Sequence, residues 1–142
     1  MTASEIRYTQ VTSAALTVEK LPDGSTAVLD QRSKDVHSLN SSATTAWEAC
    51  RQGATLAQVR KALETHAGAP VDEEIALSAL SQLRKVNLIH SDAPMSESMM
   101  NQARRSTLLR LGLVAPLVLT LALSQQRAYA FYANSGINAG NI

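Results

Sequence analysis

Short runs of apolar residues, separated by polar turns, occupy residues 16–40 of the chain. Residues 16–21 and 25–30 flank a Pro-Asp-Gly turn, in which proline presets φ and glycine accepts a positive φ. A second polar turn leads into residues 35–40, whose apolar members are Val36 and Leu39. The pattern predicts a small antiparallel three-stranded sheet. Such a sheet is too small to be stable alone, so we expect another layer to cover one face.

After the third predicted strand, the apolar residues follow the spacing of a helix. Residues 43–52 and 55–66 form the first two predicted helices; Asn40 or Ser41 can cap the first, and a Thr-x-x-Gln capping box opens the second. A third helix begins at Asp72, with acidic residues in its first turn and basic residues in its last. Three strands followed by three helices predict an α+β, winged-helix-like domain.

Composition and charge divide the chain at about residue 91. The 142 residues carry a formal net charge of +1, but residues 1–90 are net negative and the remainder is net positive. Residues 91–103 are polar and rich in Met and Ser, which is typical of a linker. Residues 104–130 contain basic residues and an uncharged apolar run, and residues 131–142 are small and uncharged. We therefore expect a globular domain, a linker, a signal-like or membrane-anchor helix, and a flexible tail.

The residue content argues against several classes of chemistry. Cys50 is the one cysteine, so the chain can form neither an internal disulfide nor a Cys/His zinc cluster. Nucleotide-binding, metalloprotease and serine-hydrolase motifs are absent from the sequence. We therefore expect no enzyme activity, no metal and no cofactor. The small net charge and the acidic start of the third helix argue against nucleic-acid binding, because a recognition helix presents basic or amide residues there.

A longer pattern within residues 16–89 resembles the PqqD family, which comprises the pyrroloquinoline quinone biosynthesis protein D and related precursor-peptide recognition elements. The family pattern is a strand ending in VLLD, a strand of the form hxLN before a helix, a Gly-Thr-like helix opening, and a Leu-x-x-Leu-x-x-x-x-Leu-Ile ending. The corresponding segments here are residues 27–30, 36–40, 43–47, 53–59 and 80–89. The resemblance rests on the whole pattern, since none of these motifs is catalytic.

The resemblance implies a non-catalytic peptide chaperone. Family members bind the leader of a ribosomally synthesised precursor peptide by β-strand addition and present it to a modifying enzyme such as a radical SAM maturase. Here the leader would pair with the third strand and lie against the third helix. The peptide-binding residues implied are Lys34, Asp35, Val36, His37, Ser38 and Leu39 in the strand and Leu77, Leu80, Ser81 and Arg84 in the helix. The apolar residues among these could equally be buried in the core of the domain.

The apolar tail allows several interpretations. Arg104 and Arg105, the uncharged run after them, and an Ala-x-Ala sequence formed by Ala128 and Ala130 together resemble a twin-arginine export signal. Residues 108–124 are just long enough to anchor the chain in a membrane. The basic residues would then keep the large domain cytoplasmic, at the inner membrane, with the C-terminal tail outside. The alternatives are an internal signal cleaved after Ala130 and a soluble helix packed on the domain.

Other functions stay open beside the peptide chaperone. One is a membrane-held winged-helix DNA-binding regulator. Another is a recognition domain fused to its own exported substrate peptide, residues 131–142, in which Asn-Ser-Gly and Asn-Ala-Gly recur four residues apart. Met99 or Met100 is also a plausible start for a separate signal peptide and product. The sequence names neither the modifying enzyme nor the leader, and it leaves the oligomeric state open.

Overall fold

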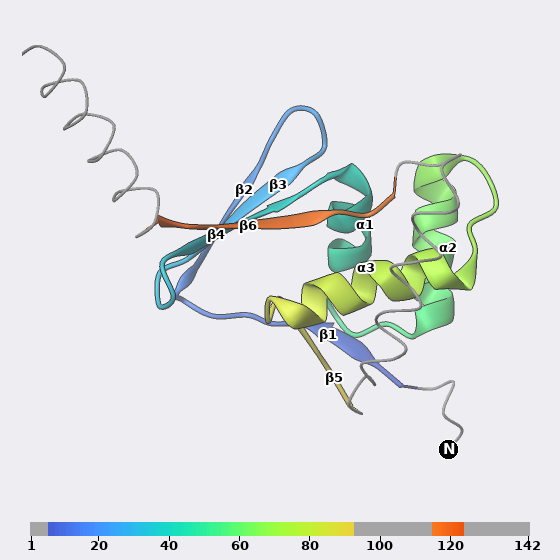
Figure 1. Ribbon diagram of the computed structural model, residues 1–142. Coiled ribbons are helices and arrows are strands. Elements are labelled where there is room, and N and C mark those ends of the chain that lie inside the picture. The colour runs from blue at the N-terminus through green and yellow to red at the C-terminus, as the bar shows by residue number, and fades with distance from the viewer. Residues whose placement is uncertain (1–5, 93–114, 124–142) are drawn as a thin grey trace, which may run out of the picture.

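A four-stranded antiparallel sheet is the largest β element of the computed structural model, which describes residues 6–92 and 115–123 (Figure 1). Its strands lie in the order β2-β3-β4-β6. Their bounds are Leu16–Lys20 for β2, Thr26–Asp30 for β3, Asp35–Leu39 for β4 and Val118–Ala122 for β6. The first three strands confirm the sequence prediction. The fourth corrects it, because the expected three-stranded sheet gains a strand from a distant part of the chain.

The turns between the first three strands follow from their residues. Gly24 has a φ of +90° in the β2–β3 turn, where the carboxylate of Asp23 accepts a hydrogen bond from the backbone N–H of Ser25 at 3.0 Å. Lys34 closes the β3–β4 turn with a φ of +61°, and its N–H donates to the carbonyl of Asp30 at 2.8 Å. These turns place β4 beside β3 in a register that pairs Val28 with His37.

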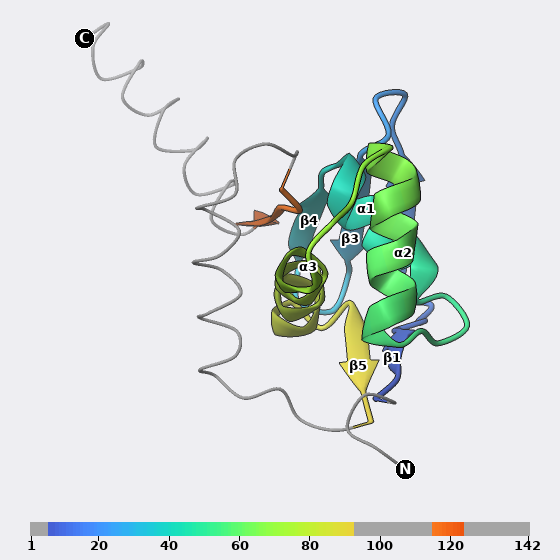
Figure 2. The ribbon, with the colours of Figure 1, turned by 90° about the vertical axis from the view of Figure 1, so that its right-hand side faces the viewer.

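Three helices follow the sheet, as the sequence predicts. They are α1 (Ser41–Ala49), α2 (Leu56–Ala67) and α3 (Glu73–Lys85). Asn40 caps α1 by accepting from the N–H of Ala43 at 2.9 Å, and Thr55 with Gln58 forms the expected capping box of α2. Gly68 ends α2 in the left-handed conformation. Figure 2 shows α3 nearly end-on beside β4, with β6 on the opposite side of β4 from β3.

A second, two-stranded sheet joins the two ends of this domain. Its strands are β1 (Tyr8–Gln10) and β5 (Ile89–Ser91), which pair antiparallel. Tyr8 also exchanges backbone hydrogen bonds with Ala54, at 2.8 and 2.9 Å. The strand β1 precedes the predicted elements, and β5 follows α3 directly.

The core is formed by side chains of the sheet and all three helices. Trp47 is an anchor of this core: it is buried, and its indole N–H donates to the carbonyl of Leu88 at 2.9 Å. The fully buried Leu39, Leu80 and Leu83 bring β4 and α3 into the same core. The α+β class and the three helices are therefore confirmed.

The apolar tail segment is the main correction to the sequence analysis. The expected helix covering residues 104–130 is a β-strand at Val118–Ala122, where the chain pairs with β4. No helix within residues 6–92 and 115–123 is long and apolar enough to cross a membrane. The rest of the expected membrane segment at 108–124, the cleavage site at Ala128 and Ala130, most of the linker at 91–103 and the tail at 131–142 lie outside the described residues.

Candidate functional site

The edge of β4 is occupied by β6, a strand more than 75 positions later in the chain. The two strands pair antiparallel over the full length of β4, from Asp35 opposite Ala122 to Leu39 opposite Val118. The ladder extends by one hydrogen bond at each end. The N–H of Asn40 donates to the carbonyl of Leu117 at 3.1 Å, and the N–H of Leu123 donates to the carbonyl of Lys34 at 2.7 Å.

The alternation of an antiparallel ladder fixes which N–H groups of β6 point toward β4. Bonds at residues 117 and 123 place the odd-numbered residues in the hydrogen-bonded positions. The N–H groups of Leu119 and Leu121 therefore point toward β4. Those of Thr120 and Ala122 point away from it, toward the open edge of the sheet. This strand is thus held by its backbone along its whole length.

Asn40 holds the start of the segment that leads into β6. Its side-chain amide donates to the carbonyl of Ala115 at 2.7 Å, and its side-chain oxygen accepts from the N–H of Leu117 at 3.0 Å. The same oxygen caps α1 through Ala43. A single residue therefore joins the end of β4, the start of α1 and the added strand.

Gln82 is the second amide that holds this segment, and it comes from α3. Its Nε2 donates to the carbonyl of Pro116 at 2.8 Å, while its Oε1 accepts from the N–H of Val118 at 2.9 Å. The Nε2 also lies 3.3 Å from the hydroxyl of Ser78, one helical turn earlier. Because the N–H of Val118 points away from β4, Gln82 satisfies a donor that the ladder leaves unpaired.

One side-chain contact links the centres of β4 and β6. The Nδ1 of His37 lies 2.8 Å from the hydroxyl oxygen of Thr120, its partner across the ladder. His37 is buried, and burial lowers the pKa of its imidazole, an effect partly opposed by the carboxylates of Asp35 and Asp30. The uncharged imidazole therefore suits this position.

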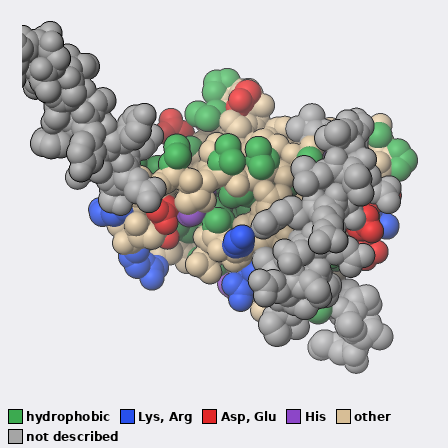
Figure 3. Space-filling view, in the orientation of Figure 1, with side chains coloured by type: hydrophobic (Ala, Val, Ile, Leu, Met, Phe, Trp, Pro, Cys, Tyr) green, Lys and Arg blue, Asp and Glu red, His purple; other side chains and the backbone are tan. Residues whose placement is uncertain are grey.

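The side chains of β6 are distributed unusually between the two faces of the sheet. Pro116 is buried, and Val118 packs against the domain core. The leucines of the strand face the other way: Leu117, Leu119 and Leu121 are 46%, 57% and 55% exposed. Figure 3 shows hydrophobic side chains gathered on this face of the molecule. The domain thus contacts the backbone of the segment and the side chains of Pro116, Val118 and Thr120, and leaves three leucines largely exposed.

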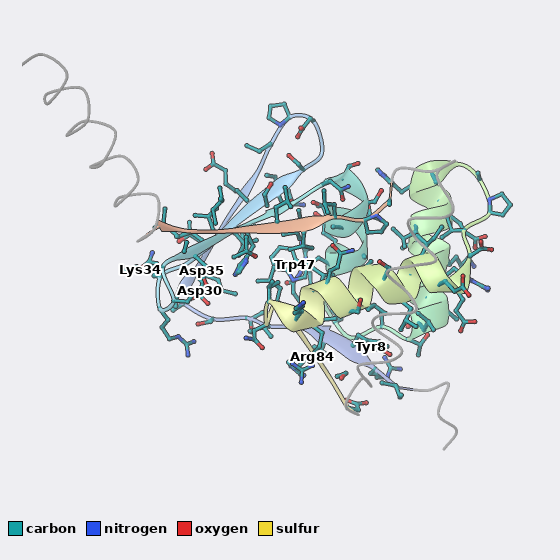
Figure 4. All side chains as sticks on the ribbon, viewed as in Figure 1. Tyr8, Asp30, Lys34, Asp35, Trp47 and Arg84 are labelled. Atoms are coloured by element: carbon teal, nitrogen blue, oxygen red, sulfur yellow. The ribbon has the colours of Figure 1, made fainter. Side chains whose placement is uncertain are left out.

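The structure brings all the predicted strand residues into this site. Asp35, Val36, His37, Ser38 and Leu39 each have a partner in β6, and the carbonyl of Lys34 accepts from Leu123. Figure 4 shows Asp30, Lys34 and Asp35 together at one end of the sheet. These positions meet the geometric requirement for strand addition, while their role in binding a separate peptide stays a prediction.

The predicted peptide-binding residues of α3 do not lie on the face of the helix that carries Gln82. At about 100° per residue, Leu80 and Arg84 are about 160° around the helix from Gln82, and Leu77 is about 140° from it. Leu80 is fully buried in the core, and Ser81 is buried with its hydroxyl donating to the carbonyl of Ser78 at 2.9 Å. Figure 4 shows Arg84 near the C-terminal end of α3. Peptide contacts by these four residues stay a prediction.

Sequence reasoning missed β6, Gln82 and the second role of Asn40. A signal for β6 is present: leucine recurs at every second position from Leu117 to Leu123, with Val118 and Thr120 between, which is a strand period rather than a helical one. The high apolar content of the segment hid this alternation. Gln82 stands one turn after Ser78 on a polar face of α3, but only the position of β6 gives that face a function.

The site offers hydrogen bonding through the backbone of β4 and the side-chain amides of Asn40 and Gln82. Among the residues that the structure describes, no three His, Cys, Asp or Glu side chains gather into a possible metal site. Cys50 is fully buried, and burial raises the pKa of its thiol to about 12, so it is not a nucleophile at neutral pH.

Comparison with known proteins identifies the domain that carries this site. Residues 25–89 match the family model of coenzyme PQQ synthesis protein D (PqqD). The matched region includes β3, β4 and the three helices, and ends before the segment that forms β6. It confirms the resemblance found in the sequence. The chain matches no curated protein and no solved structure.

Proposed function

Because residues 25–89 of this chain form a PqqD domain, we propose that the protein binds the leader of a ribosomally made precursor peptide as a strand added to β4 and presents it to a modifying enzyme. The protein contributes no covalent chemistry in this scheme. The enzyme does the chemistry, and the domain supplies affinity and orientation. An accessory binding role is consistent with the PqqD family and with the absence of catalytic motifs from the sequence.

The observation that carries the proposal is the occupation of the β4 edge by a strand from outside the PqqD match. This strand pairs with all five residues of β4 and is held by Asn40 and Gln82. Backbone pairing and amide contacts do not depend on side-chain identity, so the same edge can hold other extended segments.

Selectivity would come from the two places where side chains of the added strand enter the domain. Pro116 and Val118 fill these places in the present structure, beside Gln82. A leader that supplies a small or branched apolar residue at both positions would gain their burial. The hydroxyl of Thr120 adds a third point of recognition at His37.

The experiment that tests the proposal uses a full-length chain in which the β4 edge is free. Leu119→Pro removes an N–H that points toward β4 and an exposed side chain, so β6 should detach without disturbing the core. Failure of an alkylating reagent to label the buried Cys50 shows that the variant is folded. The isotope-labelled variant is titrated with synthetic leaders encoded beside its gene, and separately with duplex DNA.

The proposal predicts amide shifts concentrated in Asp35–Leu39 and in the side-chain amides of Asn40 and Gln82, with affinity that changes little with salt. Broad shifts on DNA with a steep salt dependence, and none with any peptide, would contradict it and favour the winged-helix regulator. The acidic start of α3, at Glu73 and Glu74, predicts the first result.

A further inference from the structure

We infer that residues 115–123 are a recognition sequence that the chain carries for its own domain, so that residues 124–142 are the peptide the domain presents. The inference rests on the proposed function, and it names the substrate as the C-terminal segment of the same molecule. It concerns the described strand β6 and the residues on its C-terminal side.

The core of the domain does not require β6. The buried residues of the hydrophobic core cluster lie between Tyr8 and Ile89, and residues 115–123 add the buried Pro116 and the half-buried Val118. A strand that completes a fold buries one of its faces. The strand β6 instead lies along the edge of β4 with no fully buried side chain, as a bound peptide can.

The direction of the leucines supports the same conclusion. A permanent edge strand places its large apolar residues on the buried face, because a shift of one residue in register would exchange the two faces. Here the leucines of β6 face solvent, and Thr120 and Ala122 alternate with them. Burial of leucine side chains therefore does not set this register. The amides of Asn40 and Gln82 and the ladder to β4 set it.

The tether makes this arrangement favourable even if the isolated sequence binds weakly. Residues 93–114 join the domain to the segment in one chain. A covalent connection between two binding partners gives an effective concentration of about millimolar order. A sequence with a dissociation constant of about 10 µM would then occupy its own groove about 99% of the time. Leaders supplied by other molecules would have to displace it.

The position of β6 also defines which residues are presented. The last described contact of the segment is the hydrogen bond from Leu123 to Lys34. The chain continues directly into residues 124–142, which include the Ala-x-Ala sequence and the Asn, Gly and Ser residues near the end. A recognition strand joined to a short polar segment is the organisation of a precursor peptide.

The first test measures whether the chain's own segment fills the groove. The probe is a fluorescein-labelled synthetic peptide of residues 113–127, titrated into full-length wild type, Leu119→Pro and Val18→Ala. Val18→Ala is the matched control, because Val18 is an exposed apolar residue on β2, at the other edge of the sheet. We expect Leu119→Pro to bind the probe at least 30-fold more tightly than wild type and Val18→Ala.

The second test measures the product. Wild type, Leu119→Pro and Val18→Ala are purified from cells that carry the natural neighbouring genes, and their intact masses are compared. We expect a mass change that maps to residues 124–142 in wild type and Val18→Ala, and its loss in Leu119→Pro. An unchanged mass of wild type would overturn the inference, as would equal probe binding by wild type and Leu119→Pro.

The same titrations separate this inference from the proposed function. If folded Leu119→Pro binds a leader encoded by a neighbouring gene but not the 113–127 probe, the inference fails and the proposed function stands. If it binds neither peptide, both fail. Binding of the probe at the β4 edge, together with the mass change, supports both.

Discussion

The imidazole of His37 lies 2.8 Å from the hydroxyl of Thr120, although the two residues are 83 positions apart in the chain. The contact joins the centre of β4 to the centre of β6, and it lies inside a ladder that begins at Asn40 and ends at Lys34. A segment whose composition predicts a membrane helix or an export signal is therefore a strand added to the edge of β4. Substitutions at the residues that hold this strand test the assignment.

Gln82→Ala should loosen β6 while leaving the domain folded. The variant loses the hydrogen bonds to Pro116 and Val118, each contributing about 1 kcal/mol. Opening of β6 should therefore be about 10- to 30-fold more frequent. Amide hydrogen exchange of Leu119 and Leu121 measures this, with the exposed Lys85→Ala on the same helix as control. Unchanged protection in Gln82→Ala would show that the ladder alone holds the strand.

Two substitutions of Asn40 should distinguish its role as the cap of α1 from its contacts with residues 115–117. Asn40→Ala loses the α1 cap as well as the contacts with residues 115–117, which should reduce the free energy of unfolding by about 1 kcal/mol. Asn40→Asp keeps the acceptor for Ala43 and Leu117 but has no donor for the carbonyl of Ala115. Urea unfolding should therefore show Asn40→Asp near wild type, while exchange at Leu119 is faster. Wild-type exchange in Asn40→Asp would mean that the donor to Ala115 is dispensable.

Proline should have opposite effects at neighbouring positions of β6. Leu121→Pro removes an N–H that points toward β4, whereas Ala122→Pro removes one that points to the open edge. We expect Leu121→Pro to release the strand and Ala122→Pro to retain it, as measured by cross-strand contacts in NMR. The reverse order would place the strand one residue out of the described register.

His37 should make stability depend on pH in the weakly acidic range. Burial holds the folded pKa of His37 below the usual 6.5, so the unfolded chain binds more protons between the two values. The free energy of unfolding should therefore fall as the pH decreases from about 6.5 through the folded pKa, and should then level off. Urea unfolding between pH 7.5 and 5 measures this.

The control for the pH dependence is another histidine. His37→Gln should flatten this part of the profile, whereas His90→Gln, at an exposed position, should leave it in place. A profile that persists in His37→Gln would assign the dependence to other groups. A profile that rises as the pH falls would contradict the direction of the pKa shift.

Local sequence signals predicted the domain well, because its turns and caps are short-range features. Asn40 and Thr55 cap their helices as the sequence predicts, and the buried Trp47 is a core anchor. The predicted edge strand also lies where the added strand pairs. Each of these depends on residues only a few positions apart or on burial of a single side chain.

The features that sequence reasoning missed depend on long-range pairing. The apolar content of residues 111–123 outweighed the alternation of Leu117, Leu119 and Leu121, since an isolated apolar run fits a helix as well as a strand. The resemblance to the PqqD family implies Leu80 and Arg84 as peptide-binding residues, whereas the residue of α3 that contacts the added strand is Gln82. The position of the partner strand decides which face of α3 contacts it. The spacing of apolar residues along α3 carries no information about that position.

The most direct test of strand addition at β4 is a measurement of Hα–Hα contacts between β4 and β6 in the full-length chain. In the described register His37 and Thr120 form a non-hydrogen-bonded pair, in which the Cα atoms approach to about 4.5 Å and the Hα protons face each other. We predict strong NMR cross-peaks from Hα of His37 to Hα of Thr120 and from Leu39 to Val118, all lost in Leu119→Pro. Absence of these cross-peaks in the wild-type chain, with β3–β4 cross-peaks intact, would contradict the account.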